Sequence, residues 1–268
     1  MEKEKSRLTE HFGISLAQLL SDKICKTKKD FPKDKFIEII QESYLEKTLK
    51  QRIELIADAL RVCLPNDYNK AVNILVNIMG DENPNETGMF THFYWLMPVG
   101  KFIEKYGLEH FDTSMKAIEE LTKRNTGEYA IRPYIKKYPT ESIQQMKLWA
   151  KSENFHLRRL ASEGLRPKLP WAKKLELFIS NPKPVFEILN ILKTEQIKFV
   201  MKSVANNLAD YIKVNPEAAF SFIKEWEKSD HKSTQWMLKH ATRKLGKSGI
   251  KGGLQTTSKH RKRLSKQP

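Results

Sequence analysis

The chain of 268 residues is 40% hydrophobic and 30% charged, a composition that is sufficient for a buried core and excludes disorder as the main state. No apolar run approaches the roughly 20 residues of a membrane-spanning helix, and two cysteines cannot build a disulfide framework. The first residues are mixed in charge and no apolar segment follows them, so we expect no secretory signal. The formal net charge of +16 favours a partner that carries phosphate, although charge alone does not identify that partner.

Apolar residues recur with the period of an α-helix along almost the whole chain. The clearest stripes lie at 37–44, 53–60, 72–79, 197–208 and 220–226. Breaks are expected where proline or glycine interrupts the pattern, at Pro65, 80–88, Gly107, Pro139, Pro170, Pro182 and Pro216. We find no convincing run with the two-residue period of a β-strand. The sequence therefore predicts an all-α fold.

Three segments indicate a repeat, because each is predicted to close a helix with a leucine: 161–165, 204–208 and 241–245. Their leucines are 43 and 37 residues apart, close to the period of about 40 that HEAT-like helix pairs show. Stacked helix pairs form a concave surface that can grip an elongated ligand, and a duplex is such a ligand for a basic protein. We therefore expect a HEAT-like helical repeat solenoid with a concave DNA-binding face.

Basic residues are concentrated at the end of the chain. Residues 231–268 contain eleven Lys and Arg and no acid, which leaves 37 basic against 32 acidic residues before this segment. A solvated, low-complexity stretch is the simplest interpretation. We predict one repeat domain over residues 1–248 and a flexible basic tail over residues 249–268.

The sequence lacks the residue spacings that define several common catalytic and binding motifs. The Gly-Lys-Ser sequence at 246–248 lacks the upstream glycine of a P-loop, since position 241 is alanine. The seven histidines form no HxxxH or HExxH pair, no GxSxG elbow is present, and neither cysteine has the local features of a nucleophile. We therefore expect no metal and no cofactor.

Charged and aromatic residues are unusually dense in three central stretches, 127–134, 157–171 and 206–210. Their residues also have ordinary structural interpretations. Glu128 could be an acid at a helix start, and Arg159 and Glu163 could form a surface ion pair. Trp171 could be a packing residue in the core.

Together these stretches resemble a known family. The string SEGLRPKLPW at 162–171, with EYAIRP at 128–133 and NNLAD at 206–210, is similar to the AlkC branch of the AlkC/AlkD-type DNA alkylation-repair glycosylases. The likeness covers residues 31–246 and departs from the family pattern at Asn207 and Ala209. The resemblance implies HEAT-like repeats and a monofunctional glycosylase. Such an enzyme removes cationic N3- or N7-alkylated bases without base flipping, and this branch is associated with 3-methyladenine and 3-methylcytosine.

The resemblance implies that Glu128, Glu163 and Asp210 are the catalytic acids. A base alkylated at a ring nitrogen is already cationic and leaves readily, so it needs little help from a general acid. The deoxyribose becomes oxocarbenium-like as the N-glycosidic bond breaks. An ionised carboxylate can stabilise that charge and orient a water for attack.

The resemblance also implies contacts to DNA. Trp171 would pack against the lesion nucleotide, and Arg159 would hold a phosphate or orient a carboxylate. Arg132, Arg158 and Arg166 lie in the same motifs and would clamp the DNA backbone, because a guanidinium matches phosphate bidentately.

We therefore expect a DNA-3-methyladenine-type monofunctional DNA glycosylase. It would act as a monomer on double-stranded DNA containing alkylated bases, in the cytoplasm of a bacterial-type cell and associated with the nucleoid. Two alternatives stay open: a non-catalytic HEAT-like module that binds damaged or bent DNA, and a helical-repeat scaffold for acidic proteins. The presence of all three acids in their motifs favours the enzyme.

Overall fold

The computed structural model describes residues 8–88 and 92–245, so the predicted basic tail at 249–268 lies outside the described residues. Every regular element within these two ranges is a helix, which confirms the all-α prediction. The chain divides into two compact units, Met1–Lys137 and Tyr138–Pro268. The single domain over residues 1–248 stays a prediction.

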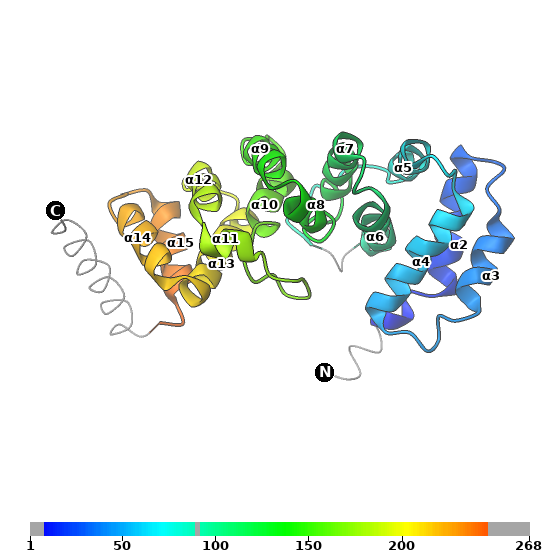
Figure 1. Ribbon diagram of the computed structural model, residues 1–268, viewed down its shortest axis with the longest axis horizontal. Coiled ribbons are helices and arrows are strands. Elements are labelled where there is room, and N and C mark those ends of the chain that lie inside the picture. Colours follow the sequence, from blue (N-terminus) through cyan, green and yellow to red (C-terminus); the bar gives the residue numbers. More distant parts are fainter. Residues whose placement is uncertain (1–7, 89–91, 246–268) are drawn as a thin grey trace. The chain divides into compact units, whose positions relative to one another are not determined.

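Short helices follow one another along both units (Figure 1). The first unit contains α2 (Ile14–Thr27), α3 (Lys33–Gln41), α4 (Leu49–Cys63), α5 (Tyr68–Asn77), η1 (Tyr94–Leu96), α6 (Met97–Tyr106), α7 (Phe111–Thr122) and α8 (Arg132–Lys137). The second contains α9 (Pro139–Trp149), α10 (Phe155–Glu163), α11 (Glu176–Ser180), α12 (Lys183–Ile191), α13 (Lys198–Val214), α14 (Pro216–Trp226) and α15 (Lys232–Thr242). None of the helices in the described ranges is long and apolar enough to span a membrane.

The predicted breaks separate the helices. α4 ends at Cys63, two residues before Pro65, and Gly107 caps the C-terminus of α6. Pro139 and Pro216 begin α9 and α14, where the missing proline N–H costs no helical hydrogen bond. The breakers therefore predicted the element boundaries well.

Two predicted stripes extend past their helices. α3 ends at Gln41 and α5 at Asn77, so Tyr44 and Met79 lie in the turns that follow. The Tyr44 ring instead packs below the Arg52 guanidinium, whose carbon lies 5.1 Å from the ring centroid. The stripe at 37–44 thus mixes a helix with a turn residue that packs against α4.

The second unit is a stack of helix pairs. α10, α13 and α15 are the second helices of three successive pairs and pack side by side; we call them the second-helix layer. Among the first helices, α9 contacts α12, and the rings of Phe186 on α12 and Phe222 on α14 stack with centroids 4.4 Å apart. This stacking confirms the predicted helical repeat. The prediction that 204–208 closes a helix was wrong, because α13 continues to Val214.

Gly107 lies at a close approach of helices in the first unit. A Cβ at this position would overlap the hydroxyl oxygens of Tyr68, Tyr134 and Ser114. The hydroxyls of Tyr68 and Ser114 lie 2.8 Å apart, and Ser114 Oγ donates to the carbonyl oxygen of Gly107 at 2.9 Å. The small size of Gly107 therefore allows α5, α7 and α8 to converge on the end of α6.

We expect Gly107→Ala to lower the free energy of unfolding by about 1–3 kcal/mol, because the added methyl group must displace buried, hydrogen-bonded hydroxyls. Gly88→Ala is the control, since a Cβ at Gly88 would meet nothing within 4 Å. Urea denaturation of both variants measures the difference. Equal free energies of unfolding for the two variants would show that the three hydroxyls move to make room for the methyl group without loss of stability.

Candidate active site

Glu163 is a buried carboxylate at the C-terminal end of α10, with 6% of its surface exposed. A carboxylate there faces the negative end of the helix dipole, and burial removes its hydration. Both effects oppose ionisation unless positive groups lie close by. The charge at this position therefore depends on neighbouring arginines.

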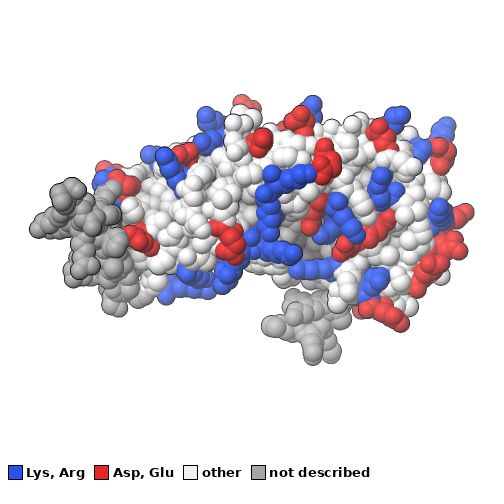
Figure 2. Space-filling view, in the orientation of Figure 1, with Lys and Arg blue, Asp and Glu red and all other residues white. Residues whose placement is uncertain are grey.

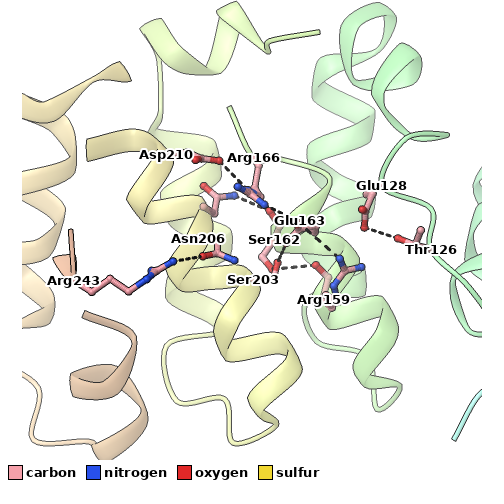
Figure 3. A network of polar contacts seen from close by, with 11 residues as sticks. Thr126, Glu128, Arg159, Ser162, Glu163, Arg166, Ser203, Asn206, Asp210 and Arg243 are labelled. Carbon is pink, nitrogen blue, oxygen red and sulfur yellow. Dashed lines mark hydrogen bonds and ion pairs between the residues drawn. The ribbon is translucent and has the colours of Figure 1, made fainter. Parts of the chain in front are cut away.

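Arg166, in the loop after α10, connects Glu163 to α13 (Figure 3). Its Nη1 donates to Glu163 Oε1 at 2.8 Å, and its Nε donates to Asp210 Oδ2 at 2.8 Å. We call Glu163, Arg166 and Asp210 the acid–arginine network. It joins two carboxylates on neighbouring helices of the second-helix layer through one guanidinium.

The arginines determine the ionisation of the network. Burial alone would raise the pKa of the Glu163 carboxyl, but the charges of Arg159 and Arg166 outweigh burial and lower that pKa below its ordinary value. Burial also opposes the charge of Arg166, yet the two carboxylates raise its pKa. Both groups are therefore ionised at neutral pH. Because buried ion pairs stabilise proteins little compared with apolar packing, the network indicates function more than stability.

Small polar residues fasten the network to α13. The Ser203 hydroxyl donates to Glu163 Oε2 at 2.6 Å and lies 2.6 Å from the Ser162 hydroxyl. The Asn207 amide donates to the carbonyl oxygen of Ser162 at 2.7 Å. Sequence reasoning missed Ser203 and Asn207 as supporting residues. Ser203, Asn207 and Asp210 stand at i, i+4 and i+7. This spacing was the available signal that the three residues share one face of α13.

The two carboxylates of the network are equally buried but differ in how many of their oxygens accept a hydrogen bond. Both oxygens of Glu163 accept hydrogen bonds, one from Arg166 and one from Ser203. Oδ2 of Asp210 accepts from Arg166, whereas no donor among the described residues contacts its Oδ1. Asp210 Oδ1 is therefore the oxygen best able to bind a water or face a cationic ligand.

Trp171 lies in the loop between α10 and α11, five residues after Arg166. It is 55% exposed, so the interpretation of Trp171 as a core residue is wrong. Its φ of 66° lies in the left-handed region, and Trp171 is the one non-glycine residue with positive φ in the described part of the chain. Such a backbone costs on the order of 1–3 kcal/mol for a bulky residue and clusters at functional sites. An exposed, strained tryptophan is a candidate ligand contact.

Arg159 approaches the network from within α10. Its Nη2 lies 3.9 Å from Glu163 Oε1, and its guanidinium carbon lies 4.7 Å from the ring centroid of Phe199 on α13. Because Glu163 is buried, the interpretation of this pair as a surface ion pair is wrong. Arg159 instead lowers the pKa of a buried acid. Its expected role, to hold a phosphate or orient a carboxylate, stays a prediction.

Arg158 is engaged elsewhere in the second unit. Its Nε donates to Glu195 Oε2 at 2.5 Å, and its Nη1 donates to the carbonyl oxygens of Ser152 and Glu153 at 2.9 and 2.8 Å. These contacts tie the start of α10 to the segment before α13. The expected backbone clamp at Arg158 stays a prediction.

Glu128 and Arg132 belong to the first unit. Glu128 is buried in the turn before α8, so it does not lie in the first turn of that helix, and it accepts a hydrogen bond from the Thr126 hydroxyl. Arg132 is the first residue of α8 and is also buried. Their predicted roles stay predictions.

Within the described ranges, no group of three or more His, Cys, Asp or Glu is placed to hold a metal ion. The acid–arginine network holds two carboxylates against one guanidinium, so the negative groups outnumber the positive group within it. The arrangement can stabilise a developing positive charge and orient a water at Asp210 Oδ1.

Three comparisons relate this chain to known proteins. A family model described as DNA alkylation repair enzyme matches residues 100–245. Uncharacterized protein YhaZ of Bacillus subtilis (strain 168) is 36% identical over 248 residues, which cover 92% of this chain and 67% of that protein. The structure of Pseudomonas fluorescens alkylpurine DNA glycosylase AlkC, bound to DNA containing an abasic site analog, matches with a TM-score of 0.80 and 28% identity. That match covers 89% of this chain and 64% of the AlkC chain, so this chain spans less than two thirds of that protein's length.

We expect Arg166→Gln to lower the free energy of unfolding by about 3–5 kcal/mol, because Glu163 and Asp210 would lose their shared counter-ion. Lys147→Gln breaks an equally short but exposed pair with Glu187 and should cost less than about 1 kcal/mol. Urea denaturation at neutral pH measures both. A small cost at both positions would mean that water, and not Arg166, compensates the two carboxylates.

Proposed function

Because this chain belongs to the DNA alkylation repair enzyme family, we propose that it is a DNA glycosylase that hydrolyses the N-glycosidic bond of alkylated bases in duplex DNA. The observation that carries this proposal is the acid–arginine network, in which one oxygen of Asp210 accepts no hydrogen bond from a described residue. The proposed substrates are cationic bases such as 3-methyladenine and 3-methylcytosine. The proposed partner is double-stranded DNA, bound by a monomer.

The chemistry of the substrate matches what the network can supply. Alkylation at a ring nitrogen makes the base cationic, so the bond to the sugar breaks without protonation of the leaving group. Positive charge then develops on the deoxyribose. An ionised carboxylate in a site that excludes water stabilises this charge more strongly than water does.

The contacts of the two acids support different roles for Asp210 and Glu163. Asp210 is proposed to be the catalytic carboxylate, with Oδ1 accepting a hydrogen bond from the water that attacks the sugar. Glu163 contributes negative charge and holds Arg166, which in turn orients Asp210 through the 2.8 Å bond to Oδ2. Arg166 is therefore proposed to be a positioning residue. Glu128 is proposed to act as a further acid.

Trp171 is proposed to contact the lesion nucleotide. Its exposed indole offers a flat face to a cationic base or sugar, and an aromatic face attracts positive charge. A contact on the protein surface does not require the base to rotate into a pocket, which supports excision without base flipping. Arg159 would reinforce the site through Glu163.

We expect Asp210→Asn and Glu163→Gln to slow single-turnover base release from methylated duplex DNA, by roughly a hundredfold or more for at least one, or about 2.7 kcal/mol in the barrier. The amides keep the shape of the acids but remove the charge that opposes the oxocarbenium ion. Glu195→Gln is the matched control, because Glu195 is similarly buried and paired with Arg158 in the same unit. Folded Glu195→Gln protein should release base at the wild-type rate.

The assay also separates the alternatives. Wild-type excision by both folded amide variants would remove Glu163 and Asp210 from the active site. Wild-type protein that binds methylated duplex DNA but releases no base would instead be a non-catalytic DNA-binding module.

A further inference from the structure

Basic and aromatic side chains form a patch on two helices of the second-helix layer. The α13–α15 patch consists of Lys198, Lys202 and Asn206 on α13 and Trp236, His240 and Arg243 on or directly after α15. The α13 members repeat every four residues, so they form one stripe along the helix, and the next position in that stripe is Asp210. The patch therefore shares α13 with Asp210, one member of the acid–arginine network.

Contacts between side chains hold the patch together. Lys198 Nζ lies 3.6 Å from the ring centroid of Trp236, and the rings of Trp236 and His240 stack at 4.8 Å with an interplanar angle of 20°. Arg243 Nη2 lies 3.4 Å from Asn206 Oδ1 (Figure 3). Lys198, Lys202 and Arg243 are exposed. The patch presents three cations and a stacked aromatic pair to solvent and contains no acid.

His240 is surrounded by positive charge. Burial first, and then the charges of Arg243 at the end of α15 and of Lys202 and Lys198 on α13, lower the pKa of His240 below its ordinary value. α14, which also packs against α15, contributes none of the charges that shift this pKa. The imidazole is therefore mostly neutral at pH 7. An anion bound among these groups would raise the pKa of His240 and favour the protonated imidazole.

We propose that the α13–α15 patch binds the phosphate backbone of duplex DNA beside the lesion, and that His240 takes up a proton from solvent when the phosphates bind. Lys198, Lys202 and Arg243 supply charge to the phosphate oxygens, and protonated His240 adds a fourth cation only in the complex. This inference rests on the proposed function, since it names a second contact with the same DNA.

An extended polyanion such as duplex DNA fits this patch better than a small phosphate-bearing ligand. The stripe runs along a helix axis, and a single small anion would occupy only part of it. Figure 2 shows Lys and Arg side chains gathered along the lower edge of this unit, below α13 and α15 as they are drawn in Figure 1. Because the stripe leads to Asp210, a duplex that lies on it would place a neighbouring nucleotide near the acid–arginine network.

The first test measures the salt dependence of binding to an unmodified duplex by fluorescence anisotropy. Lys202→Gln and Arg243→Gln should each weaken binding and reduce the slope of log K against log salt by up to about 0.9, the value for one lost phosphate contact. Lys228→Gln is the matched control, because Lys228 is an exposed lysine of the same unit that follows α14 and pairs with Glu225. The control should leave the slope unchanged.

The second test measures affinity against pH. Because phosphate raises the pKa of His240 from its lowered value, binding takes up a proton, so affinity should increase as pH falls from about 7.5. The increase can reach about tenfold per pH unit and should level off once the free protein is itself protonated. His240→Gln should remove this dependence while its affinity at pH 8 stays near the wild-type value. Thermal denaturation verifies that each variant is folded.

The outcomes separate this inference from the proposed function. Salt slopes in Lys202→Gln and Arg243→Gln equal to that of Lys228→Gln, or a His240→Gln protein with the wild-type pH dependence, would overturn the patch even if base release is normal. Weakened duplex binding in the patch variants without base release by the wild type would support the patch and reject the glycosylase. Stronger binding to duplex RNA or to anionic lipid vesicles than to duplex DNA would also overturn it.

Discussion

One guanidinium shared by two buried carboxylates is the interaction on which the rest of the candidate site depends. Arg166 pairs with Glu163 and Asp210 at 2.8 Å each, so neither acid is buried without a counter-ion. The three charges come from the end of α10, the following loop and the C-terminal part of α13. The distance between the two acids is therefore determined by how two successive helix pairs stack. A repeat architecture provides this control, because the second helices contact one another directly.

The same stacking gives the second-helix layer two adjoining surfaces with different charge. At α10 and α13, buried carboxylates are paired with a partly buried guanidinium. At α13 and α15, the cations face solvent around a stacked indole and imidazole. A duplex is itself divided in this way, with a uniformly anionic backbone and, at a lesion of this class, one cationic base. In the proposed complex, the complementary arrangement on α13 would favour a single orientation of the damaged strand.

Helical periodicity and proline breaks predicted the helices, because burial of an apolar stripe and loss of a backbone donor are local effects. The repeat period was also visible, but 204–208 was misplaced because nothing local marks whether a helix stops at Leu208 or continues to Val214. Burial of Glu163 was not predictable from its spacing to Arg159, since an exposed pair has the same spacing. The identities of the acids came from a motif, whereas their shared counter-ion depends on tertiary packing. Lys198 and Trp236 likewise meet only because α13 and α15 stack.

The backbone at Trp171 carries a consequence for engineering. Its positive φ suits glycine, which adopts that region without steric cost, so a glycine there would relieve strain in the folded chain. A screen that selects only for heat resistance would therefore tend to discard the indole, and with it the exposed aromatic face of the loop after α10. Under the proposed role of Trp171, stability and activity oppose each other at this residue. Directed evolution of the proposed glycosylase would therefore need selection for base release from the first round.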